Sequence, residues 1–194
     1  MVYQVIAIVI MALFYGCYFI KMLSQKKKGI QTDHMGKDKE GFVKFIEVTM
    51  KIITCVIPFV ELISIGTNVS FFPSGTKIAG VIVELFGVMI FICSVLTMRD
   101  SWRAGVSENE KTELVTVGIY QISRNPAFLG FDLVYIGIFL MFSNWILLVI
   151  TVFAILMLHL QIVNVEEDFL ITAFGEEYIA YCKKVNRYLG RKIF

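Results

Sequence analysis

Long apolar stretches alternate with shorter polar ones along the whole chain. The longest apolar run covers residues 126–165, and only Ser143-Asn144 interrupts it. Since a membrane-spanning helix needs about 20 apolar residues, this run is long enough for two helices. Three more apolar runs precede it. The pattern therefore predicts five transmembrane helices, which cover about residues 2–20, 43–69, 77–98, 127–142 and 145–165.

The composition agrees with an integral membrane protein. Apolar residues make up 57% of the 194 residues and charged residues only 18%, and the mean hydropathy is +0.74. This apolar share exceeds that of a typical soluble domain. We therefore expect an all-α fold with a single membrane domain over residues 1–194. The first apolar run lacks the preceding basic residues of a signal peptide, so we expect it to be retained as a helix.

The basic residues predict the orientation of the helices. Five spans place residues 21–44, 99–126 and 166–194 on one side of the membrane. These segments hold 7, 4 and 5 lysines and arginines, which is 16 of the 18 in the chain. Because cytoplasmic loops carry an excess of these residues, we expect the three segments in the cytoplasm and the N-terminus outside.

The remaining composition indicates few other partners. The four cysteines show no metal-ligand spacing, so we expect no metal site. We expect no nucleic-acid partner, and the sequence leaves the oligomeric state open.

Charged side chains inside the apolar runs are costly, so each one needs an explanation. Glu47 and Lys51 are four residues apart, which predicts a salt bridge along one helix. Glu61 and Glu84 fall at similar depths on helices of opposite direction. We expect them to be hydrogen-bonded to each other or to the backbone, or else to line a lateral opening. His159 shares a helix face with the later Glu167, and its role stays open.

Two polar blocks rich in aromatic residues flank the predicted hairpin at 127–165. The first is Gly118-Ile-Tyr-Gln-Ile-Ser-Arg-Asn-Pro-Ala-Phe-Leu-Gly130. The second runs from Glu166-Glu-Asp-Phe-Leu through Tyr181 to Arg187. A helical hairpin returns the chain to the membrane face from which it started. The two blocks are therefore expected to meet there and form a site.

At these residues the chain resembles the isoprenylcysteine carboxyl methyltransferases and, more broadly, the membrane methyltransferases that include the phospholipid methyltransferases. The family patterns are G-x-Y-x-x-x-R-H-P-x-Y-x-G and, after a hairpin, E-E-x-x-L-x-x-x-F-G-x-x-Y-x-x-Y, often followed by V-P-R. The first pattern is matched at Gly118, Tyr120, Arg124, Pro126 and Gly130. The second is matched at Glu166, Glu167, Leu170, Phe174, Gly175, Tyr178, Tyr181, Val185 and Arg187.

The likeness covers about residues 108–190 and has three departures. Asn125 replaces the histidine of the family pattern, and Phe128 replaces its tyrosine. Val163 stands where the eukaryotic carboxyl methyltransferases have an arginine.

The resemblance implies an enzyme with S-adenosylmethionine as the methyl donor and S-adenosylhomocysteine as the product. It implies that residues 99–126 and 166–194 form a cytoplasmic catalytic and cofactor-binding region. The implied cofactor-binding residues are Leu114, Val115, Tyr120, Asn125, Pro126, Phe128 and Glu167. The implied catalytic residues are Arg124 and Glu167.

The residue types suit these roles. Arg124 can pair with the acceptor carboxylate or with that of the donor. Tyr120 and Phe128 can stack on adenine or face the sulfonium through a cation–π contact. Glu167 can accept hydrogen bonds from the ribose hydroxyls or the amino group. A prenylcysteine carboxylate, with a pKa of roughly 3.3–3.7, arrives ionised and needs no general base.

The resemblance favours methyl transfer to the C-terminal carboxylate of a prenylated cysteine that enters from the bilayer among membrane lipids. The nearest alternative is N-methylation of an amino phospholipid. An amine must first lose a proton, and Glu166 or His159 could take it. A sterol-type reductase with a nicotinamide cofactor and a non-enzymatic membrane protein are weaker alternatives. The identity of the bound donor separates all four.

Overall fold

A computed structural model gives the arrangement of the chain and describes residues 1–36, 39–103, 105 and 113–192. The described part contains no β-strand. Short 3-10 turns cover Arg99–Ser101 and Gly118–Gln121, and a π-helical turn covers Ile162–Glu166. The α-helices are α1 (Val2–Lys27), α2 (Gly41–Thr67), α3 (Thr76–Met98), α4 (Pro126–Met141), α5 (Trp145–Gln161) and α6 (Glu167–Lys184). The all-α prediction is confirmed.

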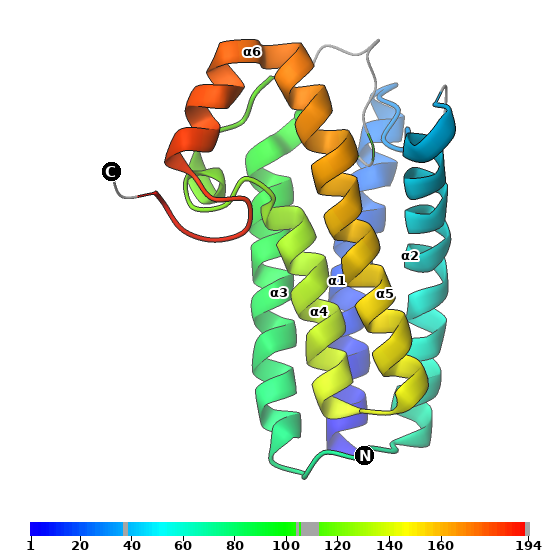
Figure 1. Cartoon of the computed structure of the whole chain (residues 1–194). Coiled ribbons are helices and arrows are strands. Elements are labelled where there is room, and N and C mark those ends of the chain that lie inside the picture. Colours follow the sequence, from blue (N-terminus) through cyan, green and yellow to red (C-terminus); the bar gives the residue numbers. More distant parts are fainter. Residues whose placement is uncertain (37–38, 104, 106–112, 193–194) are drawn as a thin grey trace.

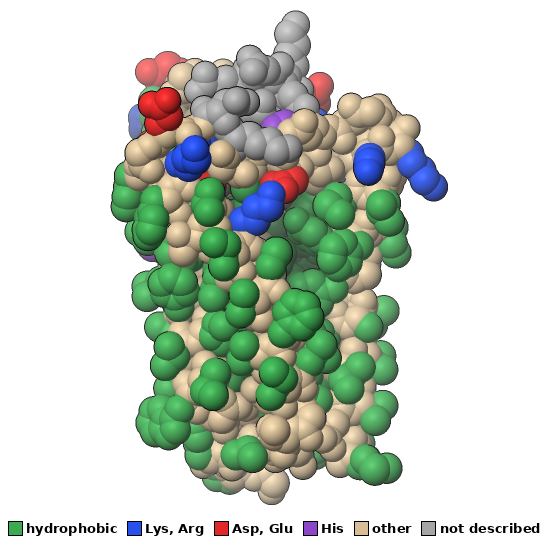
Figure 2. All heavy atoms as spheres, turned by 90° about the vertical axis from the view of Figure 1, so that its right-hand side faces the viewer, with side chains coloured by type: hydrophobic (Ala, Val, Ile, Leu, Met, Phe, Trp, Pro, Cys, Tyr) green, Lys and Arg blue, Asp and Glu red, His purple; other side chains and the backbone are tan. Residues whose placement is uncertain are grey.

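The helices are those of an integral membrane protein. α1, α2, α3 with its 3-10 extension, and the continuous helix from α5 into α6 are each long and apolar enough to cross a membrane. α4 is apolar but shorter, with 16 residues. Figure 2 shows hydrophobic side chains over most of one face of the bundle, with charged side chains gathered at its upper end. This distribution fits a bundle whose sides face lipid and whose end faces water.

The helices follow the predicted spans closely. α2 to α4 begin and end within two residues of the predicted bounds. α1 continues to Lys27, seven residues beyond its predicted end, and α5 passes through the π-helical turn directly into α6. α1 to α5 lie side by side, and α6 crosses the end opposite the N-terminus (Figure 1). The described parts of the three segments expected in the cytoplasm gather at that end; residues 104 and 106–112 lie outside the described residues.

Four glycines let α3 and α4 approach closely. A Cβ atom built on Gly137 would lie 2.6 Å from the backbone nitrogen of Glu84, and one built on Gly80 would lie 2.6 Å from the carbonyl oxygen of Gly137. Gly87 and Gly130 face each other in the same way one heptad further along. Small residues at such an interface favour helix packing in membranes, where there is little hydrophobic force between helices. This contact fixes the start of α4, and with it the first polar block.

The expected salt bridge between Glu47 and Lys51 is wrong. Lys51 instead pairs with Asp33, in the connection between α1 and α2. Glu47 is fully buried and accepts hydrogen bonds from the Gly36 backbone nitrogen at 2.7 Å and from Gln161 Nε2 at 3.5 Å. The i,i+4 rule holds for solvent-facing helix surfaces, whereas Glu47 faces the bundle.

The expected hydrogen bonds of Glu61 and Glu84 are also absent. Both side chains are fully buried, so they line no opening to the lipid. Within the described part of the chain, neither carboxyl forms a hydrogen bond of good geometry. The two residues lie in the bundle interior and take no part in the site at its end.

Candidate active site

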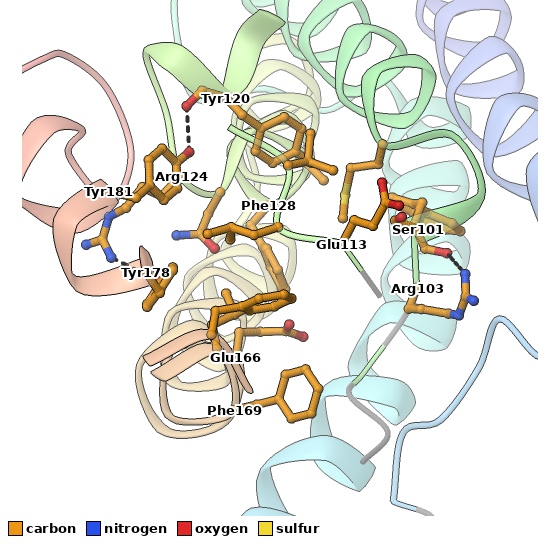
Figure 3. Close-up of a pocket in the computed structure, with 18 of the residues that line it drawn as sticks. Ser101, Arg103, Glu113, Tyr120, Arg124, Phe128, Glu166, Phe169, Tyr178 and Tyr181 are labelled. Carbon is orange, nitrogen blue, oxygen red and sulfur yellow. Dashed lines mark hydrogen bonds between the residues drawn. The ribbon is translucent and has the colours of Figure 1, made fainter. Parts of the chain in front are cut away.

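A pocket lies at the end of the bundle that α6 covers. Its walls come from the end of α3, the segment after it, the loop at 113–125 and the α4 start, and α6 closes it (Figure 3). The walls are mainly apolar and aromatic, with a few polar side chains among them. The described lining residues are Met98, Ser101, Trp102, Arg103, Gly105, Glu113, Leu114, Val115, Tyr120, Arg124, Asn125, Ala127, Phe128, Glu166, Phe169, Leu170, Phe174, Tyr178 and Tyr181.

Hydrogen bonds bring the two polar blocks together, as the hairpin argument predicts. The Arg124 backbone nitrogen donates to the Asn186 carbonyl oxygen at 3.1 Å, and Asn125 Nδ2 donates to the Arg187 carbonyl oxygen at 3.2 Å. The Tyr181 hydroxyl donates to the Tyr120 carbonyl oxygen at 2.5 Å. The loop before α4 is thus tied to the chain after α6 on both sides of Arg124.

A bend in α6 carries its second half back over the pocket. Gly175 has φ +51° and ψ −125°, and the helix changes direction there. A side chain would be strained in this conformation, and glycine adopts it without cost. The bend lets Phe169 and Phe174 before it and Tyr178 after it line the same pocket. The C-terminal helix over the second block is thus bent at Gly175.

Arg124, Glu167 and Arg187 form a partly buried charge cluster beside the pocket. Glu167 Oε1 lies 3.0 Å from Arg124 Nη1. The two Glu167 oxygens also accept from Arg187 Nε at 2.9 Å and Nη2 at 2.7 Å. Burial, the largest single influence, raises the pKa of Glu167, but the Arg187 hydrogen bonds and the two guanidinium charges together hold that pKa below its ordinary value. Glu167 therefore stays ionised and holds both arginines in place.

One donor of Arg124 is left without a partner. Nη1 donates to the Tyr178 hydroxyl at 3.1 Å and to Cys182 Sγ at 2.7 Å. Nε is buried, and among the residues that the structure describes no acceptor lies within hydrogen-bond distance of it. The side chain is 9% exposed. A buried unpaired donor is costly, so this guanidinium is suited to an anionic ligand in the pocket.

Glu166 brings a carboxylate into the apolar part of the pocket. Its side chain points from the start of α6 toward the cavity between Phe128 and Phe169 (Figure 3). Burial raises the pKa of Glu166 to about 7, the Gln161 hydrogen bond lowers it, and the Glu47 charge adds to the rise. Its charge therefore changes near neutral pH.

The structure places most of the predicted site residues in the pocket wall. Of the predicted cofactor-binding residues, the lining includes Leu114, Val115, Tyr120, Asn125 and Phe128. Arg124 also lines the pocket. Pro126 and Glu167 are not among the described lining residues. Pro126 is the first residue of α4, where its fixed φ favours a helix start, and Glu167 faces the two arginines.

Sequence reasoning missed part of the pocket. Trp102 and Arg103 follow α3 directly, and no motif marks them. Phe169 stands at an unspecified position of the second family pattern. The signal for Phe169 was its position beside the glutamate pair, whereas Trp102 could have been suspected only as a large aromatic residue at a membrane boundary.

Comparison with known proteins gives a consistent set of relatives. The family model for phospholipid methyltransferases matches residues 76–177. The protein-S-isoprenylcysteine O-methyltransferase of Xenopus laevis is 33% identical over 112 residues, which is 56% of this chain and 38% of the relative. That of Saccharomyces cerevisiae is 42% identical over 72 residues, 37% of this chain and 30% of the relative. Protein-S-isoprenylcysteine O-methyltransferase A of Arabidopsis thaliana is 29% identical over 108 residues, 55% of both chains. The matched part thus covers from 30% to 55% of the length of these relatives.

Proposed function

This chain belongs to the phospholipid methyltransferase family, and on that premise we propose that it transfers a methyl group from S-adenosylmethionine to the C-terminal carboxylate of a prenylated cysteine. The acceptor class follows that of the relatives, which are protein-S-isoprenylcysteine O-methyltransferases. The observation that carries the proposal is the unpaired, buried Nε of Arg124 in an apolar pocket at the end of a membrane bundle. A carboxylate on a lipid-modified residue has the chemistry to complete that donor.

The residues of the pocket fit S-adenosylmethionine. When bound, this donor supplies a methyl group already activated by a positive sulfur, and S-adenosylhomocysteine remains after transfer. Phe128, Tyr120 and the α6 aromatics offer faces for adenine and for the sulfonium. Leu114, Val115 and Asn125 bring backbone and amide groups to the same wall. Glu166 offers a carboxylate for the amino group or for the positive charge near the sulfur.

The two predicted residues outside the lining act on their neighbours. Pro126 starts α4 directly after Arg124 and Asn125 and so fixes the direction of the loop. Glu167 lies 3.0 Å from the Arg124 guanidinium and holds it in place beside the pocket. Arg124 is the catalytic residue of the proposal because it orients the acceptor, and Glu167 is the residue that positions it.

The reaction needs alignment more than acid–base chemistry. A carboxylate acceptor is ionised at neutral pH, and its oxygen attacks the methyl carbon as the carbon–sulfur bond breaks. Correct alignment of two reactants can lower a barrier by roughly 7–11 kcal/mol. Arg124 and the aromatic walls provide that alignment and exclude water.

The acceptor enters from the bilayer, and the reaction faces the cytoplasm. The basic segments gather at the pocket end, which the positive-inside rule assigns to the cytoplasm, with the N-terminus outside. Figure 2 shows a hollow among hydrophobic side chains just below the charged band. Such a hollow is suited to a lipid chain that approaches sideways, with membrane lipids around it.

One observation favours a second candidate, an amino phospholipid as acceptor. An amine must lose a proton before it attacks, and Glu166, with a pKa raised by burial to about 7, could take that proton. This alternative predicts a methylation rate that depends on Glu166 and rises with pH. Methylation of a carboxylate does not require Glu166 as a base.

The test is donor binding followed by acceptor choice. Calorimetry with detergent-purified protein measures the binding of S-adenosylmethionine and of S-adenosylhomocysteine. Assays in vesicles then measure the methylation of acetyl-farnesylcysteine and of phosphatidylethanolamine. We expect the protein to bind the donor and to methylate the cysteine carboxylate. In Arg124→Gln, the rate of this methylation should fall by roughly 100-fold or more. Arg191→Gln removes a cation that hydrogen-bonds Gln121 outside the pocket and should retain full activity. Folded protein without donor affinity would exclude a methyltransferase, and methylation of the phosphatidylethanolamine alone would establish the second candidate.

A further inference from the structure

Glu47 is a fully buried carboxylate on α2, and one of its two hydrogen-bond partners also contacts a residue of the pocket wall. Its oxygens accept hydrogen bonds from the Gly36 backbone nitrogen at 2.7 Å and from Gln161 Nε2 at 3.5 Å. Lys51, one turn away, pairs with Asp33 instead. Burying a carboxylate is costly unless hydrogen bonds compensate for it, so these two contacts require an explanation. The residue lies outside the part of the chain that matches the family model.

Gln161 connects this carboxylate to the pocket. It is fully buried at the end of α5, and its Nε2 lies 3.3 Å from Glu166 Oε1 as well as 3.5 Å from Glu47 Oε1. One amide nitrogen carries two hydrogens and can serve both carboxylates. Within the described chain, the Gln161 Oε1 has no partner, so the amide is oriented entirely by the two acids.

The π-helical turn at 162–166 makes this contact possible. Gln161 and Glu166 are five residues apart, and in an α-helix the neighbours on one face are three or four apart. The i to i+5 pattern of a π-helix brings the fifth residue round to the same side. Such turns occur frequently at functional sites. Here the turn directs Gln161 to Glu47 on one side and Glu166 to the cavity on the other.

We propose that Glu47 is a positioning residue of the pocket, which acts through Gln161 to hold the Glu166 carboxylate where it meets the positive charge of the methyl donor. The inference rests on the proposed function for the identity of that donor. No α2 residue is among the described residues that line the pocket. Donor affinity is thus set in part by a helix that does not touch the donor.

The surroundings of Glu166 give the proposal a readout in pH. Glu47 faces it from α2, Gln161 from α5 is uncharged, and the pocket wall adds further titratable or charged groups. Those groups are Arg103, Glu113, Tyr120, Arg124, Tyr178 and Tyr181. The negative charge of Glu47 raises the pKa of Glu166, while the Gln161 hydrogen bond lowers it. Since the ionised Glu166 attracts a cationic donor, donor affinity increases as pH rises through about 7.

Two substitutions should therefore move this pH midpoint in opposite directions. Glu47→Leu removes the negative neighbour and leaves the Gln161 amide to Glu166 alone, so the midpoint moves to lower pH. Gln161→Leu removes the hydrogen bond that favours the ionised form, so the midpoint moves to higher pH. Each variant should also bind S-adenosylmethionine roughly tenfold more weakly at its plateau, because the supporting partner is lost. A purely structural role would change the folded fraction and leave the midpoint where it is.

The experiment is calorimetric titration of full-length protein in detergent with S-adenosylmethionine between pH 5.5 and about 8.5, a range that brackets the Glu166 pKa. Glu61→Gln, a buried carboxyl on the same helix with no link to the pocket, is the matched control and should behave as the wild type. Adding Glu47→Leu to Glu166→Gln should cause no further loss, since both act through one carboxylate. If Glu47→Leu does not fold, Glu47→Gln takes its place, because it keeps the size of the side chain, removes the negative charge and should also move the midpoint to lower pH.

The outcomes separate this inference from the proposed function. Wild-type protein that binds no donor overturns the proposed function itself. Wild-type binding together with unchanged affinity and midpoint in both leucine variants overturns only the role of Glu47. Midpoints that move in opposite directions, with an unchanged control, establish it.

Discussion

The carboxylates of two regions of this protein have opposite surroundings. At the pocket end, Glu167 lies 2.7 Å from Arg187 and 3.0 Å from Arg124. In the bundle interior, Glu61 and Glu84 are fully buried, and their carboxyl oxygens form no hydrogen bond of good geometry with the described residues. In the first region a carboxylate pairs with two arginines. In the second region the carboxyl groups are enclosed by apolar helices.

The difference shows which property each region depends on. Removing one member of a buried ion pair leaves an uncompensated charge, which is strongly destabilising. A carboxyl without partners has no such pair to lose. The pocket end should therefore be sensitive to the neutralisation of single charges. The interior should be sensitive to volume and largely insensitive to changes that keep the shape of a side chain.

The largest effect is expected from Glu167→Gln. The substitution leaves Arg124 and Arg187 without their shared anion. We expect a loss of about 3 kcal/mol in the free energy of unfolding, the lower end of the range for a buried pair, because the cluster is partly exposed. Donor binding should weaken as well, because Arg124 is no longer held. Chemical unfolding in detergent and calorimetry measure the two effects. Glu176→Gln, on the exposed side of α6, is the control. Wild-type stability in Glu167→Gln would mean that the cluster is not what holds this end together.

Gly137→Ala should have the next largest effect and acts on the interior. Its Cβ would lie 2.6 Å from the Glu84 backbone nitrogen, so α3 and α4 must separate, at a cost of about 1–3 kcal/mol. Gly66→Ala on α2 is a matched control, because a Cβ there meets nothing within 4 Å. Thermal unfolding gives the melting temperatures of the two variants for comparison. Equal melting temperatures would show that the glycines are not needed for the contact.

A smaller and pH-dependent effect is expected at Glu166. Its folded pKa is raised to about 7, so the folded state binds its proton more tightly than the unfolded chain. Its contribution to stability is complete below the unfolded pKa and is lost as pH rises through about 7. The loss is at most about 1.4 kcal/mol per pH unit. Unfolding measured between pH 5 and roughly 8 should show this decline in the wild type and not in Glu166→Gln. Parallel curves for the two proteins would contradict the assignment.

The smallest effect is expected from Glu61→Gln. Glutamine keeps the size of the side chain and removes only its ability to ionise. We expect a change below the roughly 1 kcal/mol of an average substitution, with donor binding intact. Expression level and thermal unfolding check this. A large loss of folded protein would show that the interior needs a charge at this position and that the two regions are less different than their contacts indicate.

The pattern of apolar runs was sufficient to predict the helices but not their interfaces. The tight α3–α4 contact depends on Gly80, Gly87, Gly130 and Gly137, which recur every seven residues within each helix. That spacing is visible in the sequence, but it does not identify the helix against which the glycines pack. Small residues on two helices can be matched only when the two helices are aligned. The Glu47–Lys51 prediction failed for a related reason. Spacing along one helix says nothing about which face is buried against another.

The motifs predicted the position of the site better than the role of each acid. Arg124, Tyr120 and Phe128 line the pocket as expected from the first block. Of the adjacent acids in the second block, Glu166 reaches the cavity, while Glu167 pairs with arginines from two other segments. Adjacent residues on a helix point in different directions, and the π-helical turn before them sets which direction each one takes.

The sequence by itself determined the class of the protein, its helices, and the two blocks that form one site. These properties depend on local composition and on the length of a helical hairpin, and both can be read directly from the sequence. The tertiary structure decided which acid faces the cavity, which arginines share Glu167, and that α2 reaches the pocket through Gln161. Most of those properties depend on contacts between residues 20 or more positions apart. Close packing and the cost of unpaired buried charge select among such contacts only once the helices are assembled.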